Sequence, residues 1–301
     1  MTSWAPRLPV GLIAWLTTYN LDTTVAHPES FIRDYQFVAE FQHPHVDLRL
    51  NRMSADPLPE PARLPFDRVP HRTQRRLQHI PDVDTPWEDG VADFDWRSLV
   101  DLPPVHRQNH NECYAETAGV TLTALWEMLY EELDGSFNPD DLVRCAHETP
   151  GEPALPEDIL RLSSTFDPMS GCHAKAGAPT MTLAPEPVVL CDLAGDWDIE
   201  NRLMGMLAMG PVSVGIESGN QVFRLYGGGI LLPEHISTKR GVVDHAVSLV
   251  GYGEDRGKPY WTIRNSWGDD WGESGYARIE RRNDNTGVLN SYAAVTRAVK
   301  S

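Results

Sequence analysis

The stretch Asn265-Ser-Trp-Gly-Asp-Asp-Trp-Gly-Glu-Ser-Gly-Tyr276 is the most informative part of this chain. His245 stands twenty residues before its first residue, within the apolar run Val243-Asp-His-Ala-Val-Ser-Leu-Val-Gly-Tyr-Gly253. Each stretch alone is typical of a buried strand. Together they supply a histidine and an asparagine, and an amide side chain is one of the groups that can orient an imidazole base.

Cys113 lies far upstream, where a loop enters an expected helix. Unpaired N–H groups and the positive end of the helix dipole stabilise a thiolate there. An imidazolium at His245 would lower the pKa of the thiol further and protonate a leaving amine, while Asn265 would accept a hydrogen bond from the other ring nitrogen. Gln108 and the backbone N–H of Cys113 would donate to an oxyanion, at roughly 3 kcal/mol per donor. Trp267 would screen the His–Asn bond from water. This order of residues predicts covalent acyl transfer.

Each of these residues also has an ordinary structural interpretation. A lone cysteine is most often a small buried hydrophobe, and a histidine in an apolar strand is usually a hydrogen-bonded core residue. The combination of Cys113, His245 and the asparagine stretch favours catalysis, because chance would have to supply every part in order. His106 and His110 lie closer to Cys113 in sequence. Local loop geometry rarely places a side chain at i−3 for proton transfer, so His245 is the expected base.

The composition argues against two classes of function. The 301-residue chain carries a formal net charge of −17 at pH 7, which disfavours nucleic-acid binding because that needs a basic surface. No apolar run approaches the ~20 residues that cross a bilayer, and the apolar residues 9–16 are few for a signal peptide. We expect no metal, no other cofactor, no membrane span and a monomer.

The order of the predicted elements is typical of an α+β protein. Residues 1–90 include a connector rich in proline and arginine. From Phe94 onward, regular hydrophobic patterns typical of a packed globular domain begin. Helices are predicted over 114–130, 156–162 and 198–209. Strands are predicted over 212–217, 245–252, 260–265, 276–280 and 293–299. Helices followed by antiparallel strands indicate the α+β class.

Residues from Phe94 to the C-terminus resemble the mature domain of papain-like cysteine peptidases of the cathepsin type. Besides the Cys, His and Asn motifs, the matching segments are Asp95-Trp-Arg97, Leu142-Val-Arg-Cys145, Gly210-Pro-Val-Ser-Val214 and Leu225-Tyr-Gly-Gly-Gly-Ile230. The resemblance implies a helical L domain (about 91–205) that faces an antiparallel β-barrel R domain (about 206–301) across a cleft. Cys113 would lie on the L side, and His245 and Asn265 on the R side. The implied activity is hydrolysis of peptide bonds in protein or peptide substrates.

Residues 1–90 resemble the inhibitory propeptide of the same family. The pattern Glu29-x3-Arg33-x3-Phe37 matches the first half of its helix motif, and Asn51-Arg-Met53 falls where a second motif stands. The family propeptide blocks the cleft, so the resemblance implies a zymogen in which residues 1–90 inhibit the peptidase domain, residues 91–301. Five of the eleven histidines precede residue 91. Their protonation below pH ~6.5 could loosen the propeptide; ordinary surface histidines are the alternative.

The chain departs from the family pattern beside the nucleophile. Four residues separate Gln108 from Cys113 where the family usually has five, and Glu112 replaces a small residue. A carboxylate there should raise the pKa of the thiol. Gly151-Glu152 stands where the family has two glycines. These changes keep open a catalytically inactive relative that acts as a binding or storage protein. Transglutaminase-like chemistry, a third alternative, does not account for Asn265-Ser-Trp-Gly.

Alignment to the family implies one disulfide and one specificity pocket. Cys145 and Cys172 match a conserved pair, and their oxidation would favour a secretory, lysosomal, vacuolar or extracellular compartment. Small residues at two of the three positions of the family's second pocket imply a roomy apolar pocket suited to Leu, Phe or Val. Those three positions are Asp244, Gly215 and Ala294. The residues expected to line the substrate cleft as a whole are Gly151, Gly215, Asp244, Trp267 and Ala294.

Overall fold

The computed structural model describes residues 28–51, 54, 93–108, 111–130, 135–146, 154–162, 165–168, 170–172, 177, 179–191, 199–236, 243–281 and 292–299. Its helices are α2 (Pro28–Glu40), η4 (Trp96–Ser98), α3 (Cys113–Leu129), α4 (Pro139–Ala146), α5 (Pro156–Leu162), α6 (Ile199–Leu207), α7 (Gln221–Arg224) and η5 (Pro233–His235), of which η4 and η5 are 3-10 helices. Its strands are β1 (Val46–Leu48), β2 (Phe94–Asp95), β3 (Thr165–Phe166), β4 (Met181–Leu183), β5 (Val188–Cys191), β6 (Val212–Ile216), β7 (Tyr226–Leu231), β8 (His245–Asp255), β9 (Lys258–Arg264), β10 (Tyr276–Glu280), β11 (Tyr292–Val295) and β12 (Ala298–Val299). In this part of the chain no helix is long and apolar enough to cross a membrane.

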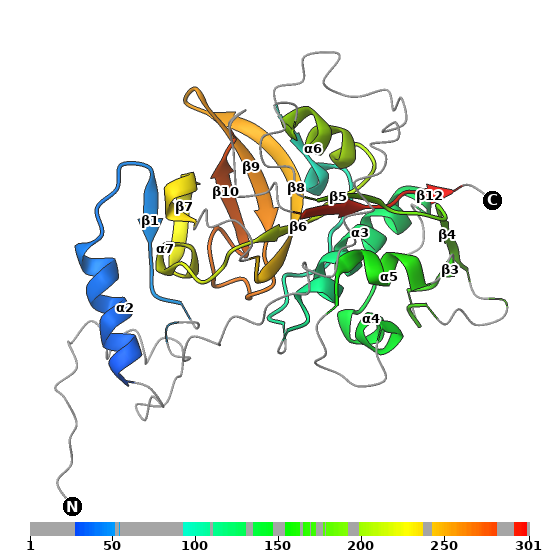
Figure 1. The fold of residues 1–301 in the computed structure, drawn as a ribbon, viewed down its shortest axis with the longest axis horizontal. Helices are drawn as coiled ribbons and strands as arrows, with labels where there is room; N and C mark the ends of the chain where they lie inside the picture. Colours follow the sequence, from blue (N-terminus) through cyan, green and yellow to red (C-terminus); the bar gives the residue numbers. More distant parts are fainter. Residues whose placement is uncertain are drawn as a thin grey trace, which may run out of the picture.

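A large curved sheet forms the core of the C-terminal half (Figure 1). Its strand order is β1-β7-β10-β9-β8-β6-β11-β5, and β2 pairs with β8. The strand pairs of this sheet are antiparallel except β7–β10, which is parallel. The first nine residues of β8 are buried, because α3 and α6 both pack against this central strand. His245 therefore begins a strand that is covered on both faces.

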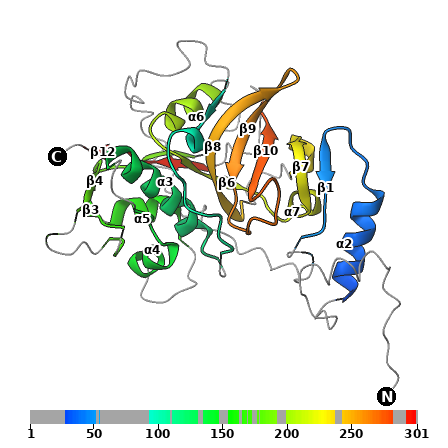
Figure 2. The same ribbon diagram turned by 180° about the vertical axis from the view of Figure 1, so that it is seen from behind.

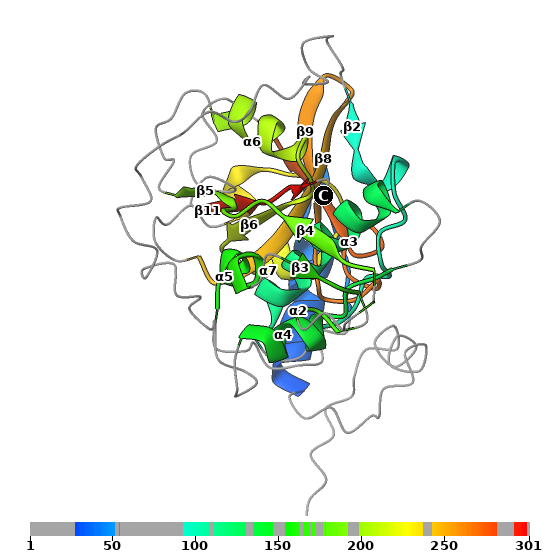
Figure 3. The same ribbon diagram turned by 90° about the vertical axis from the view of Figure 1, so that its right-hand side faces the viewer.

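Helices α3, α4 and α5 form the other half of the molecule (Figures 1 and 3). Helix α3 is buried at nearly every residue from Cys113 to Trp126, as expected for a helix that is apolar around its circumference. It packs against α4 and α5 on one side and against β6 and β8 on the other. The first residue of α3 thus lies where the helical half meets the sheet, in contact with Ala246.

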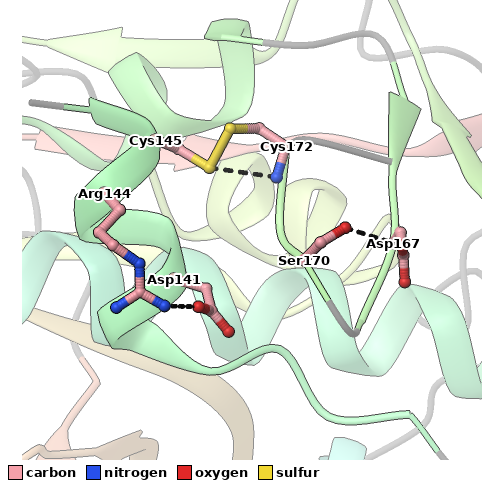
Figure 4. The surroundings of a disulfide bond; sticks show 6 residues. All are labelled: Asp141, Arg144, Cys145, Asp167, Ser170 and Cys172. Carbon is pink, nitrogen blue, oxygen red and sulfur yellow. Dashed lines mark hydrogen bonds and ion pairs between the residues drawn. A yellow bond between two sulfur atoms is a disulfide. The ribbon is translucent and has the colours of Figure 1, made fainter. Parts of the chain in front are cut away.

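A disulfide between Cys145 and Cys172 joins the end of α4 to the turn after β3 (Figure 4). The backbone N–H of Cys172 also donates to Cys145 Sγ at 3.1 Å. Within the turn, Ser170 Oγ donates to Asp167 Oδ2 at 2.8 Å. Gly171 has φ +63° and a Cβ at this position would lie 3.2 Å from Cys145 Sγ, so glycine suits the turn. The disulfide implied by the family resemblance is present.

The N-terminal segment adds a strand to the edge of the large sheet (Figure 2). Strand β1 pairs antiparallel with β7, with Val46 opposite Gly229. The backbone N–H of Ile230 donates to the carbonyl of His45 at 2.8 Å. Gly229 has φ +91°, and a Cβ there would collide with the His45 carbonyl. A glycine in β7 is therefore what permits the close approach of β1.

Helix α2 is held to α7 by a buried ion pair. Asp34 and Arg224 are 0% and 2% exposed, with 3.3 Å between Oδ2 and Nη1. Gln221 Nε2 donates to the other oxygen of Asp34 at 2.9 Å, and Asn51 Nδ2 donates to the Arg224 carbonyl at 3.0 Å. Phe31 adds a fully buried aromatic ring from the same helix. The segment is anchored by both buried charge and apolar packing.

The structure differs from the sequence prediction at the C-terminal strand and at α4, and it adds short elements that the sequence did not predict, among them β5, β7 and α7. The strand predicted over 293–299 is two strands, because the chain passes from the large sheet (β11) to the small sheet β12-β4-β3 at residues 296–297. Helix α4 was not expected, since eight residues show little periodicity. Its start nevertheless has a local signal: Asn138 Oδ1 accepts a hydrogen bond from Asp140 N at 2.9 Å, as a capping side chain does.

Candidate active site

Cys113 is the first residue of α3, and its side chain is 2% exposed. Burial raises the pKa of its thiol to about 12, hydrogen bonds from the backbone of Ala246 and Tyr114 oppose the increase, and Asp244 adds to it. Glu112 was expected to raise the pKa of the Cys113 thiol, but it acts on the neighbouring Tyr114 instead. Burial, and then Glu112, raise the pKa of the Tyr114 hydroxyl to about 12. In this buried form the sulfur holds its proton.

His245 and Asn265 form a buried pair at the start of β8 and just after β9. His245 Nε2 lies 2.8 Å from Asn265 Oδ1, so the ring nitrogen donates and Nε2 carries the proton. Trp267 stacks on the imidazole, with 5.0 Å between ring centroids and 22° between the planes. Burial lowers the pKa of His245 to about 4, and the hydrogen bond to Asn265 opposes this shift. The imidazole is neutral and fixed in one tautomer.

Gln108 is tied to the residues that follow Asn265. Its backbone N–H donates to the Ser266 carbonyl at 2.8 Å, and Ser266 Oγ donates to Gln108 Oε1 at 2.5 Å. An isolated bridge between Arg107 and Trp267 continues this pairing. Ser266 was not singled out from the sequence, although it stands inside the motif. These contacts bring the segment before Cys113 alongside the residues that follow Asn265.

Two of the residues predicted for the second pocket lie on the neighbouring strands β6 and β11, and the third, Asp244, immediately precedes β8. Gly215 of β6 is paired with Ala246 of β8, and Ala294 of β11 with Ser213 of β6. The carboxylate of Asp244 accepts a hydrogen bond from the Ser218 backbone at 2.6 Å, while burial raises its pKa. Their role in substrate selection stays a prediction. Gly151 lies outside the described residues.

Comparisons with known proteins place this architecture in one family. A family model described as "Papain family cysteine protease" matches residues 164–296. Oryzain beta chain of Oryza sativa subsp. japonica is 33% identical over 211 residues, which are 64% of this chain and 44% of that protein. Papaya proteinase 4 of Carica papaya is 31% identical over 221 residues, 69% of this chain and 61% of that protein. The chain thus spans less than two thirds of the length of either relative.

Solved structures of proforms share the fold. The Amb a 11 cysteine protease of ragweed pollen in its proform matches with a TM-score of 0.76 and 18% identity, covering 100% of this chain and 90% of that one. Digestive procathepsin L 3 of Tenebrio molitor matches with a TM-score of 0.70 and 19% identity, covering 95% and 98%. The predicted α+β, papain-like fold is confirmed. The chain belongs to the papain family of cysteine proteases.

Proposed function

We propose that the chain is a cysteine endopeptidase that hydrolyses peptide bonds through the thiolate of Cys113 and a covalent acyl-enzyme. The observation that carries the proposal is the buried His245–Asn265 hydrogen bond beneath Trp267, beside the helix that begins at Cys113. Asn265 occupies Nε2 of the imidazole, which leaves Nδ1 as the nitrogen for exchanging a proton with sulfur. A base held in one tautomer by a third group is the arrangement that nucleophilic catalysis needs.

The proposed reaction has two half-reactions. His245 takes the thiol proton, the sulfur of Cys113 attacks the peptide carbonyl carbon, and an oxyanion forms. Collapse breaks the C–N bond as the imidazolium gives its proton to the leaving amine, which yields a thioester. A water molecule then loses a proton to His245 and attacks the thioester. The C–S bond breaks, the carboxylic acid leaves, and the thiol–imidazole pair is restored.

The backbone N–H of Cys113 and the side-chain amide of Gln108 are the proposed donors to the oxyanion. The Ser266 hydroxyl contacts the oxygen of the Gln108 amide, which orients the amide with its N–H₂ end as the donor. A preorganised donor of this kind contributes roughly 3 kcal/mol to transition-state stabilisation. We therefore assign Ser266 the task of orienting Gln108.

We further propose that residues 1–90 are an inhibitory propeptide of the domain formed by residues 91–301. The support is the paired β1–β7 edge and the buried Asp34–Arg224 ion pair, which together anchor the N-terminal segment. The Cys145–Cys172 disulfide favours an oxidising compartment such as the secretory pathway, a vacuole or the cell exterior. We also propose that the substrates are proteins or peptides and that the protein is a monomer.

A second candidate is a binding or storage protein without activity. It is favoured by the acidic Glu112, which is 8% exposed and immediately precedes Cys113, where the family resemblance implies a small residue that leaves room for the substrate backbone. The buried Cys113 and His245, whose pKa values both favour the neutral forms, are compatible with it as well.

The two candidates are separated by covalent labelling. Acid-processed protein is treated with an epoxide inhibitor of thiol peptidases, and the labelled residue is located by mass spectrometry. A peptidase carries the label on Cys113 and cleaves a denatured protein substrate, while Cys113→Ala does neither. Absence of label and of cleavage after complete removal of residues 1–90 would establish the inactive alternative.

A further inference from the structure

A small cavity lies beside Asn265, between α3 and the neighbouring strands. Its volume is about 10 Å³, which is close to the minimum that accommodates one water molecule. It is lined by Glu116, Thr117 and Val120 of α3, Ser248 of β8, and residues 264–266. Six of these seven residues carry a polar side chain, so the cavity offers the two to four polar partners that one buried water needs.

Asn265 presents a buried donor that the described residues do not satisfy. Its Oδ1 is engaged twice, by His245 Nε2 and by the backbone N–H of Ser266, both at 2.8 Å. Its Nδ2 is buried and has no hydrogen-bonding partner within the described ranges. A buried amide N–H₂ left without an acceptor costs about 1–3 kcal/mol. The amide therefore calls for an acceptor on its nitrogen side.

Glu116 is the carboxylate that lines the same cavity. It lies one helical turn after Cys113, so both side chains are on the same face of α3. The charged groups that act on it are Arg264, which favours the ionised form, and Glu112 and Asp140, which oppose it. Burial outweighs these effects and raises the pKa of Glu116 to about 7. An acceptor oxygen is available in both protonation states.

We propose that Glu116 is a positioning residue: through one water in this cavity it accepts the hydrogen bond of Asn265 Nδ2 and fixes the amide with Oδ1 toward His245. This inference rests on the proposed function and deepens it. The two ends of an amide differ little in shape, so the hydrogen-bond network selects between them. With the amide turned around, Nδ2 would face the proton on His245 Nε2 and the imidazole would lose its orienting acceptor.

The test compares Glu116→Leu and Glu116→Gln in processed enzyme, using a peptide substrate. We expect Glu116→Leu to lower kcat about tenfold, equivalent to about 1.4 kcal/mol, with KM within twofold. Glu116→Gln keeps an acceptor oxygen and should retain at least half of the activity. Glu127→Leu, on the same helix and outside the cavity lining, is the matched control and should leave kcat within twofold. If Glu116→Leu is no slower than Glu127→Leu, or if Glu116→Gln is as slow as Glu116→Leu, the inference is wrong.

A second readout does not depend on activity. Nitrogen-15 NMR of the His245 ring in the full chain reports which ring nitrogen carries the proton. We expect the wild type and Glu116→Gln to show Nε2–H, and Glu116→Leu, or Glu116→Ala if the leucine variant does not fold, to show a mixture of tautomers. A pure Nε2–H form in the leucine or alanine variant overturns the inference. A wild type that shows the expected tautomers but cleaves no peptide and takes no label refutes the proposed function alone.

Discussion

Removing the charge of Asp34 should release the N-terminal segment from the sheet. Asp34→Asn keeps the shape and the contact with Gln221 but takes the carboxylate away from Arg224, which is 2% exposed. Removal of one partner of a buried ion pair typically costs about 3–5 kcal/mol, or roughly 10²- to 10⁴-fold in the docking equilibrium. Hydrogen exchange measures the docking equilibrium at the amides of Ile230 and Arg49. These amides donate to the carbonyls of His45 and Leu225, between the N-terminal segment and the sheet.

The measurement is made in a Cys113→Ala background, so that processing cannot occur. Asp47→Asn is the matched control, because Asp47 is an exposed carboxylate on β1 and such surface changes usually stay within ±0.5 kcal/mol. A double variant, Asp34→Asn with Arg224→Leu, should recover part of the lost protection since no unpaired charge remains buried. Exchange in Asp34→Asn within twofold of the parent would refute the role given to this ion pair.

Three further outcomes follow from the structure. In the unprocessed chain, the pKa of Cys113 near 12 and that of His245 near 4 predict slow alkylation of the thiol that accelerates continuously from pH 6 to 9; a rate plateau in that range would contradict this. Replacing both Cys145 and Cys172 by serine should lower the free energy of unfolding, measured in urea, by about 3.5 kcal/mol, because the disulfide closes a loop of 27 residues. A loss below about 1 kcal/mol would contradict this stabilising role. Burial raises the pKa of Glu157 to about 7, so the folded state binds this proton more tightly than the unfolded state, and stability falls by about 3 kcal/mol from pH 4.5 to pH 7. Glu157→Gln should remove that slope, and an unchanged slope would show that another group causes it.

The local sequence pattern was sufficient to predict the elements that carry the proposed site residues. The predicted and observed bounds agree at 156–162 and 276–280, and the central helix begins at Cys113, one residue before the predicted start. These segments combine clear periodicity with marked ends, such as the acidic first turn of α5. The order of cysteine, histidine and asparagine could be interpreted because each of them stands at the start or end of such an element.

Long-range pairing could not be predicted in the same way. The Asp34–Arg224 ion pair joins residues far apart in sequence, and neither residue carries a local signal for the other. The parallel pairing of β7 with β10 and the crossing from β11 to β12 depend on how the two halves pack. Glu116 illustrates the limit: helical spacing predicts that it shares a face with Cys113, but only the packing of α3 brings it to the cavity beside Asn265.

The central claim is that His245 converts Cys113 into a thiolate once the site opens to water. It is tested most directly by the rate of Cys113 alkylation in processed protein between pH 4 and 9. The account predicts rapid alkylation that is already established well below pH 7 and is lost in His245→Gln. A single rise near pH 8.5, the ordinary value for a thiol, with no effect of His245→Gln, would contradict it.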